Sequence, residues 1–79
     1  MPTMSVENYL KAILSLHEEG KPQVSTTELA RRVEATPAST SAMLKKLGEK
    51  GWVEHKLYHG VHLTSSGQRI AMDILRRHR

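Results

Sequence analysis

Hydroxyl-bearing and small side chains are concentrated in residues 36–42, and the basic pair Lys45-Lys46 follows them. Pro37 suits the first position of a helix, so the run stands where a helix begins. Small side chains there bury little apolar surface, but they let another molecule approach the backbone closely. Hydroxyl groups and free amides at a helix start also favour phosphate oxygens. Capping explains the first hydroxyl group but not the later ones or the lysine pair, so the run predicts contact with a phosphate-bearing partner.

The other basic residues indicate the same class of partner. The 79-residue chain has a formal net charge of +4 and a sequence pI near 9.8. Its cations gather in clusters: Arg31-Arg32, Lys45-Lys46, Lys50, Lys56 and Arg76-Arg77-His78-Arg79. Because neutralised phosphates release counterions, a polyanion fits such a surface. A solvated basic surface without a partner is the alternative that charge alone leaves open.

Catalytic and metal chemistry have less support in the sequence. The acidic residues and the five histidines have no spacing that unites a nucleophile, a base and an orienting group, so we expect no enzyme. The lack of cysteine excludes a disulfide framework and thiolate zinc sites. His55 and His59 straddle a predicted turn, and His62 points to the other face of that hairpin from Val61 and Leu63. We therefore do not expect these three histidines to form a metal cluster.

Two helical patterns precede the small-residue run. The first ends at Gly20-Lys21-Pro22 and has its stripe at helical spacing: Val6, Tyr9, Leu10, Ile13, Leu14 and His17. The second opens at Ser25 or Thr26, and Ser25-x-x-Glu28 fits a capping box. Its buried stripe comprises Leu29, Ala30 and Val33.

The third predicted helix contains the small-residue run. Thr36 is placed to cap it, Pro37 holds its first position, and Gly51 ends it. Three-and-four spacing turns one set of side chains inward: Thr40, Met43, Leu44 and Leu47. The same spacing leaves a second set outward or lateral: Ala38, Ser39, Ser41, Ala42, Lys45, Lys46 and Glu49.

A hairpin and a last helix complete the pattern. In the first strand Val53, His55 and Leu57 alternate with Glu54, Lys56 and Tyr58; the returning strand holds Val61 and Leu63, and the turn lies near Tyr58-His59-Gly60. Thr64-Ser65-Ser66-Gly67 caps the last helix, whose stripe is Gly67, Ile70, Ala71, Ile74 and Leu75. We expect Ile74 and Leu75 to lie exposed beyond a core that the other elements fill.

This order of elements is that of a winged helix-turn-helix, an α+β fold with a three-helix core, a two-stranded β wing and a C-terminal helix. We expect residues 1–79 to form one such domain, and no apolar run predicts a signal peptide or membrane span. A cytoplasmic location follows. In this fold the start of the third helix enters the major groove of double-stranded DNA, and Lys56 and His59 of the wing can touch phosphates. The alternative function is a protein-interaction module. A weak salt dependence of binding to duplex DNA would favour this alternative.

Five motifs in order give this chain a family resemblance. They are E-N-Y-L-K-A-I near the start, P-A-S-T-S, L-x-x-K-G-W-V, Y-x-G-V-x-L-T-x-x-G and R-R-H-R at the end. Together they cover nearly the whole chain. The sequence resembles the N-terminal domain of the diphtheria-toxin-repressor family, which comprises iron- and manganese-responsive transcriptional regulators.

The resemblance implies a repressor whose first domain binds operator DNA and whose second domain forms the homodimer and completes the metal sites. We accordingly expect this chain to be the first domain of a longer regulator. It also implies DNA contacts from positions on the third helix: Thr36, Ala38, Ser39, Ser41 and Ala42. Position 42 often carries a longer polar side chain in the family. Ala42 can offer only a methyl contact, for example to thymine.

The metal ligands implied by the resemblance are only partly present. Members of the family place a carboxylate or thioether in the slot that Asn8 occupies here, and some add a carboxylate where this chain has Lys11. A charged ammonium group cannot ligate a divalent cation. His78 matches a family histidine and is the one candidate ligand, in a full-length protein. We expect no metal cofactor in this chain alone, and iron or manganese in the full-length protein.

Overall fold

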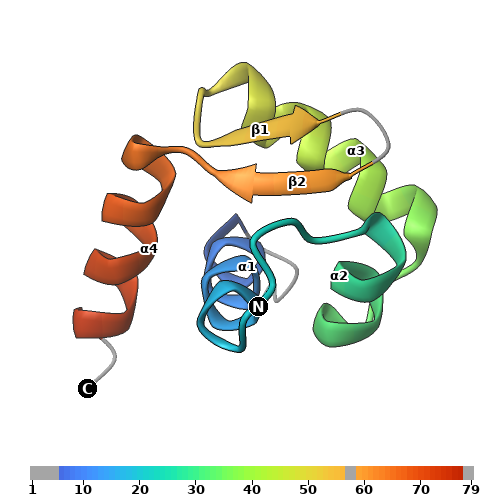
Figure 1. Ribbon diagram of the computed structural model, residues 1–79. Coiled ribbons are helices and arrows are strands. Elements are labelled where there is room, and N and C mark those ends of the chain that lie inside the picture. Colours follow the sequence, from blue (N-terminus) through green and yellow to red (C-terminus); the bar gives the residue numbers. More distant parts are fainter. Residues whose placement is uncertain (1–5, 57–58, 78–79) are drawn as a thin grey trace.

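The structure is a computed structural model that describes residues 6–56 and 59–77 (Figure 1). These residues form α1 (Val6–Glu18), α2 (Thr26–Val33), α3 (Pro37–Glu49), β1 (Val53–Lys56), β2 (Gly60–Leu63) and α4 (Ser65–Arg77). The two strands are antiparallel. The predicted α+β winged helix-turn-helix is confirmed, with every element in the expected order. Leu57, Tyr58 and His78, which the sequence placed in the wing and in the last basic cluster, lie outside the described residues.

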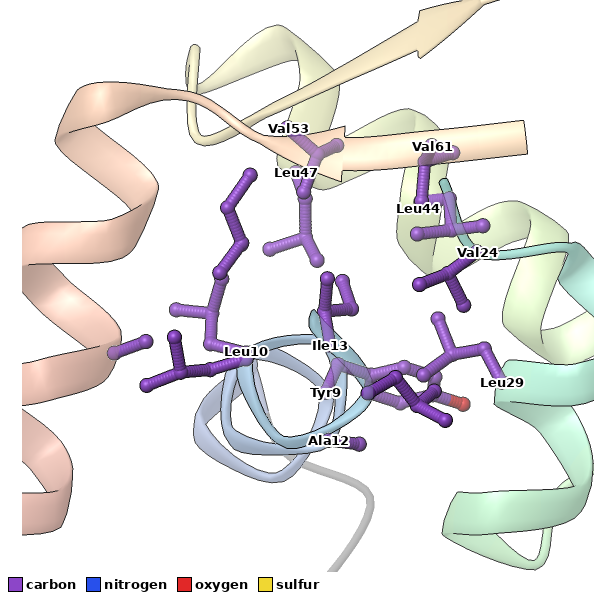
Figure 2. Close-up of a cluster of buried hydrophobic side chains, with 14 of the residues drawn as sticks. Tyr9, Leu10, Ala12, Ile13, Val24, Leu29, Leu44, Leu47, Val53 and Val61 are labelled. Carbon is purple, nitrogen blue, oxygen red and sulfur yellow. The ribbon is translucent and has the colours of Figure 1, made fainter. Parts of the chain in front are cut away.

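The core of the fold is built around α1, which packs against α4 on one side, α2 on the other and β2 across its top (Figure 1). Figure 2 shows Tyr9, Leu10 and Ile13 of α1 in one cluster with side chains from α2, α3 and the hairpin. The predicted stripe of α1 is buried except at its ends, where Val6 and His17 are partly exposed. Because one core joins all of these elements, the wing and α3 are held in a fixed relation.

Two hydroxyl caps begin the helices of the helix-turn-helix. The Ser25 hydroxyl accepts a hydrogen bond from the Glu28 amide at 3.1 Å, and the Thr36 hydroxyl accepts one from the Ser39 amide at 3.1 Å. Both caps are where the sequence predicted them. The carboxylate of Glu28 turns away from the predicted capping box and lies 2.9 Å from the Lys21 ammonium. The second half of that box was therefore wrong.

A residue in the left-handed region follows each of these two helices. Glu34 has a φ of 60° after α2, and Gly51 has a φ of 79° after α3. The amides of the next residues reach back to carbonyls in the last turns, at 2.9 and 3.0 Å. Glycine adopts this conformation at little cost, whereas glutamate has a Cβ that disfavours it. The turn between α2 and α3 is consequently short and bends sharply at Glu34.

The hairpin pairs Val53 with Leu63 at its base and Lys56 with Gly60 at its far end. Only Val53 is buried in β1, so the predicted alternation was wrong at His55, which is exposed. The reason is that the strand runs beyond the core after its first residue, and neither face is covered there. Val61 in β2 is fully buried and forms an additional bridge with Val24.

The last helix, α4, covers the side of α1 that α2 leaves free (Figure 1). Ile74 is 2% exposed, so the expectation of an exposed residue there was wrong: α4 packs along α1 and extends the core instead of passing beyond it. Leu75 is partly buried, and Met72 is 50% exposed. No helix within the described ranges is long and apolar enough to cross a membrane.

Candidate nucleic-acid interface

The exposed face of α3 is made of the residues that the sequence assigned to it. All of the predicted outward side chains are exposed: Ala38, Ser39, Ser41, Ala42, Lys45, Lys46 and Glu49. Ala38, Ala42 and Lys45 follow one another at helical spacing on one face, and Ser39 and Lys46 lie seven residues apart to one side of it. The inward set is also correct, with Thr40, Leu44 and Leu47 buried and Met43 partly buried. The first two turns of α3 thus present only short side chains to solvent.

The two hydroxyl groups at the start of α3 are bonded to each other. Thr36 accepts from the Ser39 amide and donates its own proton to the Ser39 hydroxyl oxygen at 3.0 Å. The Thr36 hydroxyl is therefore occupied in the cap. The Ser39 hydroxyl still has a proton that it can donate to an outside acceptor. The exposed Ser41 hydroxyl is likewise able to donate, so Ser39 and Ser41 both offer a polar proton at this end of α3.

The basic residues divide into two groups that the sequence did not separate. Ion pairs within the protein involve Lys21 with Glu28, Arg32 with Glu19, Arg76 with Asp73 and Arg77 with Glu7. The Lys50 ammonium lies 5.2 Å from the centre of the Trp52 ring. Within residues 6–56 and 59–77, no acidic partner is found for Lys45, Lys46 or Lys56. Lys45 and Lys46 of α3 and Lys56 of β1, for which the sequence predicted phosphate contacts, thus have no ion pair among the described residues.

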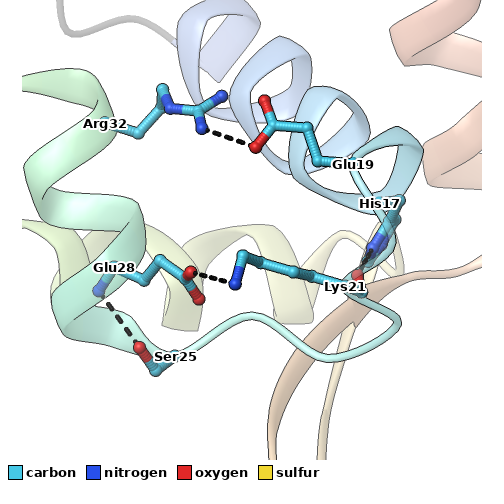
Figure 3. A network of polar contacts seen from close by, with 6 residues as sticks. All are labelled: His17, Glu19, Lys21, Ser25, Glu28 and Arg32. Carbon is cyan, nitrogen blue, oxygen red and sulfur yellow. Dashed lines mark hydrogen bonds and ion pairs between the residues drawn. The ribbon is translucent and has the colours of Figure 1, made fainter.

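The network around α2 shows how two of the other cations, Lys21 and Arg32, are engaged within the protein (Figure 3). One Arg32 nitrogen lies 2.9 Å from the Glu19 carboxylate, and the other donates to the Ser15 hydroxyl at 3.3 Å. The hydrogen bond from Arg32 holds the pKa of Glu19 below its ordinary value of 4.5, and the same contact raises the pKa of Arg32. These bonds tie α2 to the end of α1. Arg32 is therefore engaged within the protein.

The wing contributes exposed polar groups beside α3. Lys56 ends β1 and is exposed, and the exposed His59 donates its amide to the Lys56 carbonyl at 2.9 Å. β1 packs against α3. Lys56 is the last residue of this strand, and His59 lies in the turn that follows it. His62 is directed elsewhere, toward Glu54 at 3.1 Å and Gln23 at 3.4 Å. The part of the chain that the structure describes contains no group of three or more residues of metal-binding type, the wing histidines included.

Comparison with known proteins shows the family to which the chain belongs. The sequence model for "Iron dependent repressor, N-terminal DNA binding domain" matches residues 1–61. The chain belongs to this family. It is 35% identical over 77 residues to an uncharacterized HTH-type transcriptional regulator of Methanocaldococcus jannaschii, and it covers 62% of that protein. It is 35% identical over 78 residues to the HTH-type transcriptional regulator MntR of Shouchella clausii, and it covers 54% of that protein.

A third relative gives the same result. The HTH-type transcriptional regulator MntR of Geobacillus thermodenitrificans is 32% identical over 78 residues, which are 99% of this chain and 55% of that protein. The chain thus spans about half to three fifths of the length of these relatives. It is a DNA-binding domain of a family of transcriptional regulators, which is not an enzyme class. The resemblance noted in the sequence is confirmed.

The family description names iron, but the residues at the implied metal position do not suit a divalent cation. A shallow hollow between α1, α2 and α4 is lined by Asn8, Lys11, Ala12, Ser15, Arg32, Val33, Glu34 and Leu75. It holds two cationic side chains and a single carboxylate. Divalent metals require several oxygen, nitrogen or sulfur ligands and are repelled by ammonium and guanidinium groups. The described residues therefore form no metal site at this position, and His78 lies outside them.

Sequence reasoning missed three features of this region. They are the left-handed Glu34, the Arg32 contact with α1, and the two bonds of His17 to the backbone of Lys21 and Leu63. Arg32 and Glu19 are 13 residues apart, and His17 and Leu63 are 46 apart, so no local spacing reveals either contact. The one signal in the sequence for the His17 bonds was the position of this polar residue in the last turn of α1, just before Gly20-Lys21-Pro22.

Proposed function

We propose that the domain binds double-stranded DNA in a sequence-specific manner, with the first two turns of α3 in the major groove. The observation that carries this proposal is the face of α3: short side chains at its start, followed by two lysines that no acidic residue of the described chain neutralises. Short side chains let the helix approach base edges closely, and lysines beside them meet the phosphates. Ser39 donates to a base-edge acceptor, and Ala38 and Ala42 offer methyl contacts.

The other predicted contacts have separate roles in this proposal. Lys45, Lys46, Lys56 and His59 contact phosphates, and these contacts set orientation and strength rather than sequence preference. Thr36 orders the start of α3 through its cap, and Ser41 lies on the exposed face beside the groove. Support for the wing contacts comes from the packing of β1 against α3.

We further propose that these 79 residues act as one domain, the N-terminal part of a longer metal-dependent repressor. The length of the relatives and the family description support this. Such a repressor would work as a homodimer on an operator with two half-sites, because a two-fold protein reads a two-fold site. The place of action would be the cytoplasm. Iron or manganese would be its metal, held by residues beyond those described here and, in the longer protein, by His78.

This chain alone is expected to bind Mn²⁺ or Fe²⁺ weakly, since Asn8 and Lys11 stand where ligands would be needed. Titration calorimetry with MnCl₂ and with anaerobic Fe²⁺ measures this directly. A stoichiometric site tighter than about 10 µM, lost in His78→Ala, would contradict the expectation. Asn8→Asp together with Lys11→Glu supplies two carboxylates on one face of α1 and should strengthen Mn²⁺ binding.

Selection from a random pool of short duplexes tests the proposed function. Recovered sequences should share a motif, and Ser39→Ala should change the preferred base at one position while nonspecific affinity stays nearly constant. Ser65→Ala, at the exposed start of α4, is the matched control and should leave the motif unchanged. Recovery of no common motif by the unaltered domain would overturn sequence-specific reading. Binding with little salt dependence would favour the protein-interaction alternative instead.

A further inference from the structure

The edge of β2 that faces away from β1 is closed by two different partners. Val61 exchanges both of its backbone hydrogen bonds with Val24, at 2.8 and 2.9 Å. Leu63 lies two residues further on, so its amide points to the same edge. There the acceptor is Nε2 of His17, at 3.2 Å. The imidazole of His17 thus replaces the carbonyl that a third strand would offer at the base of the wing.

A second contact decides which nitrogen of that ring carries the proton. Nδ1 of His17 lies 2.7 Å from the carbonyl oxygen of Lys21, as Figure 3 shows. A carbonyl oxygen only accepts, so Nδ1 must donate, and Nε2 keeps a lone pair for the Leu63 amide. Both contacts are satisfied together only by the neutral ring with its proton on Nδ1. The ring connects the end of α1, the following turn and the last residue of β2.

We propose that His17 is a positioning residue for the wing and that its neutral form holds β2 against α1. Protonation of Nε2 turns the acceptor into a donor that faces the Leu63 amide. The hydrogen bond from Leu63 to His17 is therefore lost in acid. Leu63 ends β2 and directly precedes Thr64, whose hydroxyl accepts from the Gly67 amide at the start of α4. The position of the wing beside α3 then depends on pH. Only the consequence for DNA binding rests on the proposed function.

The groups that line the hollow around the His17 ring are mostly uncharged. The hollow around the ring is lined by Leu14, Pro22, Gln23, His62, Leu63 and Gln68. β2 contributes His62, which is paired with Glu54 of β1, and α4 contributes the uncharged Gln68. The Lys21 ammonium is engaged by Glu28. No carboxylate lines this hollow among the described residues.

Nuclear magnetic resonance of the free domain tests the proposal without DNA. At about pH 7.5 the ¹⁵N shifts of the His17 ring should report the neutral Nδ1–H form, and the Leu63 amide should be protected from exchange. On acidification that protection should fall, because a ring protonated on Nε2 offers the Leu63 amide no acceptor. A proton on Nε2 at the higher pH, or protection of Leu63 that does not change with pH, would overturn the proposal.

Three variants separate positioning from simple loss of packing. His17→Leu removes the acceptor, and the protection factor of Leu63 should fall roughly 5- to 10-fold at about pH 7.5. His17→Gln keeps an acceptor oxygen that does not titrate, so protection should return and no longer depend on pH. His55→Gln removes an exposed wing histidine and should keep the full pH dependence of the unaltered domain. Equal protection in His17→Leu and the unaltered domain would contradict the proposed role.

DNA binding provides the functional measurement, with one selected duplex as the probe. Between about pH 7.5 and 5.5, affinity should fall roughly threefold more for the unaltered domain and His55→Gln than for His17→Gln. Identical pH profiles in all three would show that His17 does not act through the wing. If no variant binds a selected duplex, the proposed function fails, while the exchange data still decide the role of His17.

Discussion

Replacing Lys45 and Lys46 together by alanine tests the assignment of unneutralised charge to α3. Both side chains are exposed, and neither has an acidic partner among the described residues. Each phosphate that a lysine neutralises contributes about 0.9 to the slope of log affinity against log salt. Loss of both contacts should therefore flatten that slope by about 1.8. The unaltered domain should bind more tightly than the variant, and the ratio of their affinities should fall roughly tenfold between about 50 and 200 mM salt.

Fluorescence anisotropy with several unrelated duplexes provides the assay, because phosphate contacts should weaken binding alike on every sequence. Arg76→Gln with Arg77→Gln is the matched control: it removes the same charge from α4, where Asp73 and Glu7 lie 3.6 and 4.0 Å away. The control should leave the slope nearly unchanged. An unchanged slope in the lysine variant, or equal flattening in the control, would refute the assignment.

Three further predictions concern stability and titration. Thr40→Val should raise the free energy of unfolding by about 1 kcal/mol in a urea titration, because the Thr40 hydroxyl is buried without a partner in the described chain; a loss would contradict this. Gly67→Ala should lower the free energy of unfolding by about 2 kcal/mol, since a Cβ there would overlap the Trp52 carbonyl oxygen, and unchanged stability would show that α4 shifts freely. Because the pKa of Glu19 is lowered, its bond to Arg32 stabilises the fold above about pH 4.5, and this stabilisation is lost as the pH falls through the lowered pKa. In Arg32→Gln the pKa of Glu19, measured by ¹³C NMR titration, should return toward 4.5. An unchanged pKa would refute the pairing.

The helices and caps could be predicted because they depend on nearby residues. Ser25 and Thr36 cap helices by bonding amides three residues further along, which is a local pattern. The inward face of α3 follows from helical spacing alone. The same reasoning was wrong where distant elements decide: His55 is exposed because β1 leaves the core, and Ile74 is buried because α4 lies along α1.

The exposed face of α3 could be predicted from the sequence, but the pairing of the surrounding charges could not. Spacing placed Lys45, Lys46 and the small residues outward, and the structure agrees. Spacing could not show that Arg32 is engaged by α1, since the two chain segments meet only in the folded domain. It also gave no sign that the Thr36 hydroxyl would donate to the Ser39 hydroxyl oxygen in addition to capping the helix. The pairing of charges across elements is a property of packing, and one-dimensional patterns do not contain it.

An NMR titration of the ¹⁵N-labelled domain with a selected duplex maps the DNA contacts residue by residue. We expect the largest amide shifts in residues 36–46 and at Lys56 and His59, with much smaller shifts for a scrambled duplex. Amides of α1 and α4 should change little. Shifts concentrated on α1 and α4, or equal responses to the selected and scrambled duplexes, would contradict sequence-specific binding through α3 and the wing.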